Sequence, residues 1–123
     1  MNQNTRISDS SWVAVAAREF SDHWHRLGLH SLAEVAKELG ESYYTVRKLD
    51  CRRPDPTLRL YTCFSLFNGL WALAVSQSPE LVAEEERLFA DSLGRIVRSL
   101  PLSPKLDRER RWALEQWSAS GHD

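Results

Sequence analysis

The residues best suited to chemistry lie on the outward face of one short predicted helix. Tyr44, Arg47 and Lys48 are three and four positions apart, so at 100° per residue they share that face. Arginine and lysine side chains donate hydrogen bonds to phosphates and to guanine acceptors, and a tyrosine packs against a thymine methyl or donates to phosphate. Tyrosine is also enriched at protein interfaces. The face therefore suits recognition of DNA or of another protein.

The distribution of charge indicates that any recognition of DNA depends on a local patch of the surface. The whole chain carries 16 basic and 17 acidic side chains, for a formal net charge of -1. Such a balance creates no global field that would draw the protein to nucleic acid or to an anionic membrane. Residues 41–61 hold five basic and three acidic side chains, a net of +2. Any DNA contact must come from this patch.

Other kinds of chemistry find little support. His23 and His25 are two residues apart on a predicted helix and point to different faces, and Cys51 and Cys63 do not form a Cys-x-x-Cys pair. The chain contains no phosphate-binding glycine loop, nucleophile elbow or metalloprotease helix motif. We therefore expect no metal, no cofactor and no enzymatic activity.

Size and composition predict one packed domain. The chain has 123 residues, of which 42% are hydrophobic and 27% charged. The first ten residues show no basic-then-apolar signal pattern, so we expect a cytoplasmic protein without a disulfide framework. The longest nearly uncharged run, residues 60–78, includes several polar side chains and is too short for a membrane span, so no membrane association is expected.

Start and stop signals of helices divide the chain and predict an all-α fold. A first helix carries an apolar stripe from Trp12 to Leu27 and ends at Gly28. A second is capped by Ser31 and ends at Gly40, and a third is capped by Ser42. Proline after a capping residue predicts three more helices, beginning at Asp55-Pro56, Ser78-Pro79 and Ser103-Pro104, the last two near residues 79–100 and 104–118.

Two closely spaced capped helices with a glycine turn form a helix-turn-helix pattern over residues 31–56. This stretch resembles the DNA-binding unit of the Cro and lambda-repressor-like family, often called XRE-type, and the resemblance extends over roughly residues 12–75. The positions that fit the first helix and turn are Ser31, Val35, Ala36, Leu39 and Gly40, and those that fit the second helix are Ser42, Thr45, Val46 and Leu49.

The resemblance implies a set of DNA-binding residues. Members of the family place the second helix in the major groove, with its first residues and those one turn later at the base edges. Carried over by position, this implicates Ser42, Tyr43, Tyr44, Arg47 and Lys48. Cys51-Arg52 replaces the glycine usual after this helix, and Arg52 or Arg53 is expected to add a phosphate contact.

The last part of the chain lies outside the resemblance. We expect a lead at residues 1–10 that is flexible, a helix-turn-helix domain at 11–76, a C-terminal extension of one or two helices at 77–118 and a tail at 119–123. An apolar stripe in the extension is long enough to pack on the domain or on another copy of the chain. The residues expected at a dimer or partner interface are Leu93, Ile96, Val97, Trp112 and Trp117.

Two functional interpretations follow. The first is a sequence-specific, DNA-binding transcriptional regulator that reads a palindromic operator as a homodimer. A repressor is favoured, because nothing in the sequence resembles an effector pocket. The second is a non-enzymatic regulatory protein, similar to an anti-activator or an antitoxin, that binds another protein through exposed aromatic side chains.

Overall fold

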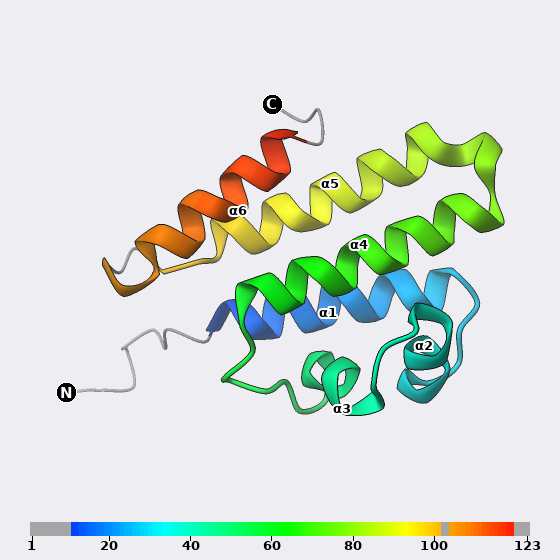
Figure 1. Ribbon diagram of the computed structural model, residues 1–123, viewed down its shortest axis with the longest axis horizontal. Coiled ribbons are helices and arrows are strands. Elements are labelled where there is room, and N and C mark those ends of the chain that lie inside the picture. Colours follow the sequence, from blue (N-terminus) through cyan, green and yellow to red (C-terminus); the bar gives the residue numbers. More distant parts are fainter. Residues whose placement is uncertain (1–10, 102–103, 120–123) are drawn as a thin grey trace.

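The computed structural model describes residues 11–101 and 104–119, and all regular structure in these ranges is helical (Figure 1). The predicted flexible lead at 1–10 lies outside the described residues, as does all of the predicted tail after Ala119. The elements are α1 (Ser11–Arg26), α2 (Leu32–Leu39), α3 (Tyr43–Val46) with the 3-10 turn η2 (Arg47–Leu49), α4 (Leu60–Gln77), the 3-10 turn η3 (Pro79–Leu81), α5 (Val82–Arg98), the 3-10 turn η4 (Pro104–Leu106) and α6 (Asp107–Ala119). The prediction of an all-α fold is confirmed for this part of the chain.

The four longer helices lie side by side, and the two short ones are attached along one flank (Figure 1). α5 runs back along α4 and also contacts α1, and α6 folds back onto α5. The centre of the core is formed by Phe20 of α1 and Phe67 of α4, whose ring centroids are 5.4 Å apart. Both rings are fully buried, so the bundle supplies a rigid base for α2 and α3.

The C-terminal helices belong to the same core as the N-terminal ones. Phe89 and Ile96 of α5 and Ala113 of α6 are buried in one hydrophobic cluster with Trp12 of α1 and Phe67 of α4. The predicted boundary at residue 76 falls inside the last turn of α4. In the described ranges, the segment expected to be an extension therefore completes the core of the domain.

The start of α4 differs from the prediction. We expected the helix to begin at Asp55-Pro56, but it begins at Leu60. The Asp55 carboxylate accepts from both the backbone N–H and the hydroxyl of Thr57, at 2.8 and 2.6 Å, and the Leu58 N–H donates to the Asp55 carbonyl. An aspartate that bonds to the chain two residues on stabilises a turn in competition with a helix. Leu58, which is buried, then anchors this turn to the core before the chain extends at Arg59.

α2 is held against α4 at a glycine. A Cβ placed on Gly69 of α4 would lie 3.2 Å from Cδ2 of Leu39, the last residue of α2. A Cβ here would be a tight contact and would require the Leu39 side chain to move by a few tenths of an ångström. The contact fixes the position of the two short helices relative to the bundle. None of the described helices is both long and apolar enough to cross a bilayer.

Candidate nucleic-acid interface

Two serine caps and one glycine turn build the unit that carries the site. The Ser31 hydroxyl accepts from the Glu34 N–H at 3.1 Å, and the Glu34 carboxylate reaches back to the His30 N–H. The Ser42 hydroxyl accepts from the Thr45 N–H, also at 3.1 Å. These bonds satisfy amide donors that the first turn of a helix leaves without partners. Both predicted caps are confirmed.

Gly40 makes the turn between the two helices. Its φ of 68° lies in the left-handed region, which favours glycine. The Gly40 N–H donates to the Lys37 carbonyl and the Glu41 N–H to the Ala36 carbonyl, so the end of α2 closes as a Schellman motif. The chain then enters α3 within three residues, as the helix-turn-helix pattern predicts.

α3 presents its aromatic and basic side chains to solvent. Val46 and Leu49 have no exposed surface and anchor the segment in the core. On the opposite side, Tyr43 is 51% exposed and Tyr44 is 68% exposed, values high enough for both rings to contact a partner. Arg47 is exposed and Lys48 is half-buried. The predicted orientation of this face is confirmed.

The cations on this face fall into two groups. Arg52 is bound to the Asp50 carboxylate through its Nε and Nη2 atoms, at 3.1 and 3.0 Å. These hydrogen bonds hold the pKa of Asp50 below its ordinary value. Arg47 and Lys48, in contrast, form no salt bridge with any described carboxylate, and the Arg47 guanidinium lies 5.2 Å from the centroid of the Tyr44 ring. They are the cations available to an incoming phosphate.

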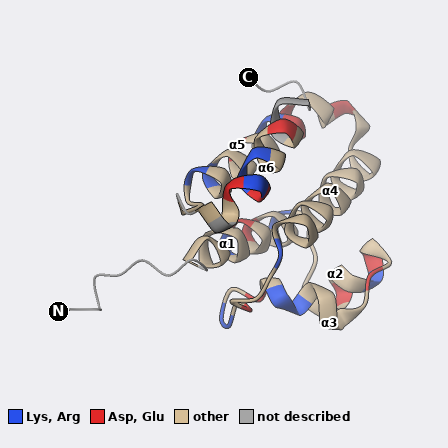
Figure 2. Ribbon diagram, turned by 60° about the vertical axis from the view of Figure 1, so that its left-hand side comes forward, with Lys and Arg blue, Asp and Glu red and all other residues tan. Residues whose placement is uncertain are grey.

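Arg53 shares a groove with Tyr44, Arg47 and Lys48, and Arg52 does not. The groove has a volume of about 480 Å³ and is lined by Tyr43, Tyr44, Arg47, Lys48, Asp50, Arg53, Pro54, Asp55 and Pro56. Its two carboxylates reduce the positive charge: Asp50 is paired with Arg52, and hydrogen bonds from Thr57 lower the pKa of Asp55 so that it stays ionised. Figure 2 shows Lys and Arg along α3 and in the loop that follows it.

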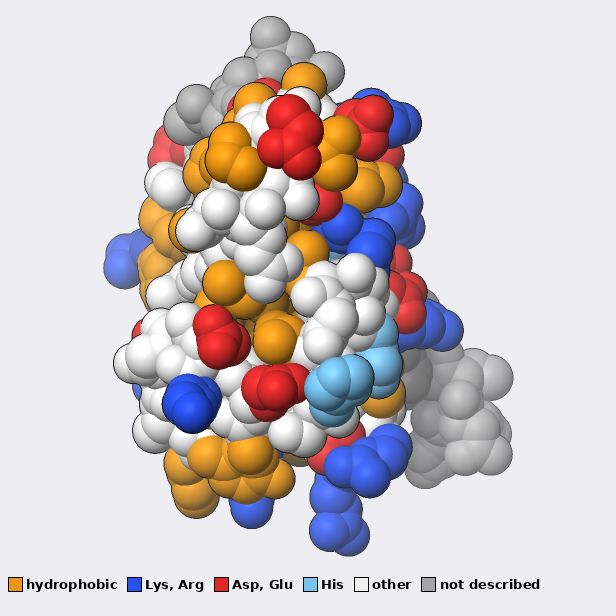
Figure 3. Space-filling view, turned by 90° about the vertical axis from the view of Figure 1, so that its right-hand side faces the viewer, with side chains coloured by type: hydrophobic (Ala, Val, Ile, Leu, Met, Phe, Trp, Pro, Cys, Tyr) orange, Lys and Arg blue, Asp and Glu red, His pale blue; other side chains and the backbone are white. Residues whose placement is uncertain are grey.

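Arg52 lines a second groove on the other side of Tyr43. This groove, of about 550 Å³, lies between the end of α1, the start of α2 and the 50–52 turn, and includes His25 and His30. Both histidines are exposed, and Figure 3 shows His side chains near Lys and Arg on one face of the molecule. Sequence reasoning missed this pair, because the only signal was its position on either side of the Gly28 turn.

Most of the residues expected at a dimer or partner interface are inside the protein. Leu93 is 9% exposed, Ile96 0% and Val97 7%, and all three pack in the shared core. Trp112 of α6 stacks edge-on against Tyr61, at 4.4 Å between centroids, and against Phe64. Trp117 lies in α6, but its side chain is outside the described residues. The stripe on α5 faces the domain, because α1 and α4 offer it a complementary apolar surface.

A buried polar chain joins α1 to α5. Arg95 donates two hydrogen bonds to Glu19, and the Ser92 hydroxyl donates to the same carboxylate at 2.7 Å. His23 Nε2 lies 2.7 Å from Ser92 Oγ, and Arg26 donates to His23 Nδ1 at 2.8 Å. Because an arginine only donates, Nδ1 accepts and Nε2 carries the proton of a neutral imidazole. Every bond in the chain then has one donor and one acceptor.

This row of hydrogen-bonded side chains has a structural role. The trio of Glu19, Ser92 and His23 has the residue types of a nucleophilic site, but Ser92 is 1% exposed and directs its proton at Glu19. Burial lowers the pKa of His23 to about 4, with a further contribution from Arg26. Burial raises the pKa of Glu19, but the hydrogen bonds from Arg95 and Ser92 outweigh it and leave the pKa below its ordinary value.

Comparison with known proteins adds no family to this description. Neither the protein-family models, nor the curated proteins, nor the solved structures yield a match to the chain.

Proposed function

We propose that this protein is a sequence-specific, double-stranded-DNA-binding transcriptional regulator. One observation carries the proposal: α3 follows α2 after a tight glycine turn, is capped by Ser42, and exposes Tyr44 and Arg47 while its opposite side is anchored in the core. Helix-turn-helix proteins place such a helix in the major groove, where side chains on the outer face meet base edges.

The residues have distinct roles in this proposal. Arg47 and Lys48 bind phosphate or guanine, and Tyr43 and Tyr44 pack on thymine methyls or donate to phosphate. Arg53 contacts the backbone from the adjoining loop. Ser42 positions the helix through its cap, since its hydroxyl already bonds to Thr45. Arg52 contributes least, because Asp50 neutralises it.

A single α3 covers one half-site, so we infer that the protein binds as a symmetric homodimer to a palindromic operator. Two such helices read half-sites about 34–36 Å apart. The predicted α5 stripe is used by the core, so the dimer contact must form elsewhere on the surface. We infer that the protein acts as a repressor, because a protein bound to an operator can exclude other proteins from the site.

Salt-dependent binding of a labelled duplex tests the role of α3. Arg47→Ala combined with Lys48→Ala should reduce affinity at low salt and lower the slope of log affinity against log salt by about 2. The matched control is Arg87→Ala combined with Arg98→Ala, which removes the same charge from exposed positions on α5. Equal losses in the two double variants would mean that only overall charge matters, and would refute the assignment.

A second function is favoured by the exposure of the tyrosines. With Tyr43 and Tyr44 open to solvent and a net charge of -1, the same face suits a protein partner in the manner of an anti-activator or antitoxin. In that case Tyr44→Ala would abolish partner capture, while the Arg47 and Lys48 double variant would leave it intact. The DNA proposal predicts losses of DNA binding in both variants.

A further inference from the structure

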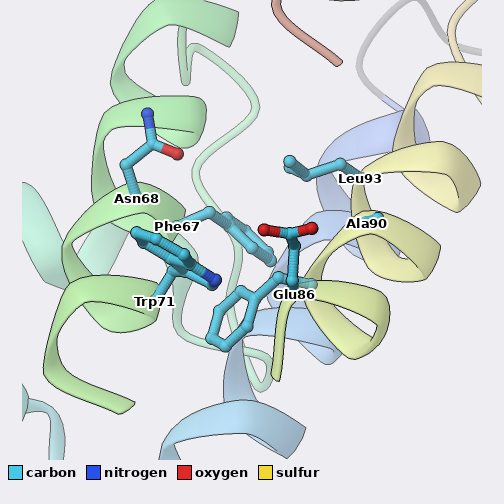
Figure 4. Close-up of a pocket in the computed structure, with 7 residues that line it drawn as sticks. Phe67, Asn68, Trp71, Glu86, Ala90 and Leu93 are labelled. Atoms are coloured by element: carbon cyan, nitrogen blue, oxygen red, sulfur yellow. The ribbon is translucent and has the colours of Figure 1, made fainter. Parts of the chain in front are cut away.

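A hollow between α4 and α5 lies away from the α3 face. It has a volume of about 230 Å³ and is lined by Phe67, Asn68, Trp71, Glu86, Phe89, Ala90 and Leu93. An engineered protein cavity of about 150 Å³ holds benzene, so this space accommodates one aromatic ring with a short chain. Figure 4 shows Trp71 on α4 facing α5 across this space.

The walls of the pocket are aromatic. Phe67 is fully buried, Phe89 is 4% exposed, and Trp71 is partly buried beside them. Phe67 and Phe89 have almost no exposed surface, and the His23 imidazole covers one face of Phe89, so Trp71 is the ring whose face a cation can approach. Ala90 and Leu93 complete an apolar lining. Such a site favours an apolar body that carries a positive charge.

The only charged residue in the lining is Glu86. Its carboxylate extends into the space between the two helices (Figure 4). A carboxylate accepts several hydrogen bonds, so it can bind an ammonium group in addition to other donors. The neighbouring Glu84 on α5 is exposed, while Glu85 is already paired with Arg26 at 2.7 Å. Glu86 therefore supplies the charge that the pocket lining carries.

We propose that the pocket between α4 and α5 binds a small organic cation, with the apolar body of the ligand among Phe67, Trp71 and Phe89 and its ammonium group at Glu86. No sequence pattern predicts this pocket, because its two walls come from helices whose pairing is not encoded locally. The pocket is separate from α3, so ligand binding and DNA binding are tested independently.

The test compares three probes of one shape: 2-phenylethylammonium, neutral 2-phenylethanol and anionic 3-phenylpropionate. Each is titrated into the full chain while the indole N–H signals of its five tryptophans are followed by NMR. Trp71→Phe identifies the Trp71 signal. We expect a saturable shift of that signal with the ammonium probe, about tenfold weaker binding of the alcohol, and no binding of the carboxylate.

Two glutamate variants separate the pocket from general surface charge. Glu86→Gln should remove the preference for the ammonium probe, and Glu84→Gln, an exposed site on the same helix, should retain it. Ala90→Leu should fill the pocket and block both the ammonium and the alcohol probe. If the Ala90→Leu variant fails to fold because its packing is perturbed, the Glu86→Gln variant decides the test. The proposal is overturned if the Trp71 signal does not respond, if the alcohol binds as well as the ammonium, or if both glutamate variants behave alike.

Discussion

The imidazole of His23 lies flat against the ring of Phe89, with centroids 4.0 Å apart and planes at 9°. The same imidazole bonds to Ser92, so one α1 side chain meets α5 through both an apolar face and a polar edge. Phe89 is also a wall of the α4–α5 pocket. The packing of α1 against α5 therefore depends on a neutral histidine.

The neutral state of His23 predicts a loss of stability in mild acid. The pKa is about 4 in the folded protein and near 6.5 in the unfolded chain, so the unfolded chain binds more protons between these values. The stabilisation that comes from keeping His23 neutral is fully present above pH 6.5 and is lost as the pH falls towards 4. We expect a decrease on the order of 2 kcal/mol over this range, measured by urea unfolding.

His23→Gln is the control for this titration. The variant is less stable at pH 7.5, because it loses the stacking on Phe89, but its stability should fall less steeply between pH 6.5 and 4.5. The lowered pKa of Glu19 acts below about pH 4.5, outside this window, since its contribution is lost only as the pH falls through the folded pKa. Parallel pH profiles for the two proteins would show that His23 does not titrate as described.

Gly40→Ala should destabilise the turn between α2 and α3. No atom lies within 4 Å of a Cβ at this position, so the cost is conformational and amounts to about 1 kcal/mol for a left-handed alanine. Gly40→Asn should cost less, because asparagine tolerates this backbone region. Denaturant unfolding of both variants measures the difference. An alanine variant as stable as the parent would mean that the turn does not hold the left-handed conformation.

Trp112→Ala should weaken the fold and leave assembly unchanged. The indole packs on Tyr61 and Phe64, so removing it costs about 2 kcal/mol or more in the free energy of unfolding. Leu114→Ala, at an exposed position of α6, should change stability by less than about 0.5 kcal/mol. Analytical ultracentrifugation checks assembly. Unaltered stability with a changed oligomeric state would restore Trp112 to an interface.

Local signals predicted much of the α2–turn–α3 segment. Ser31, Ser42, Gly28 and Gly40 act on neighbours within a few residues, so their caps and turns could be read directly from the sequence. The outward orientation of Tyr44 likewise follows from helical periodicity alone. Asp55 was misread for a related reason: the same side chain caps a helix or closes a turn, and its bonds to Thr57 selected the turn.

Long-range pairing could not be predicted. Periodicity showed that Leu93 and Ile96 share an apolar face, but it did not show what covers that face, and the answer is the chain's own α1 and α4. The bond between His23 and Ser92 spans 69 positions, and no local pattern announces it. The α4–α5 pocket has the same origin, since Trp71 and Glu86 meet only after the two helices pack.

Sequence-specific DNA binding is tested by selection from a randomised double-stranded DNA pool. The purified protein is incubated with the pool at low and then at physiological salt, and the retained DNA is sequenced. We expect an enriched palindrome with half-sites about one helical turn apart, which the Arg47 and Lys48 double variant fails to enrich and the Arg87 and Arg98 double variant still enriches. Retention at low salt without enrichment, lost at physiological salt, would contradict sequence-specific binding and leave only charge attraction.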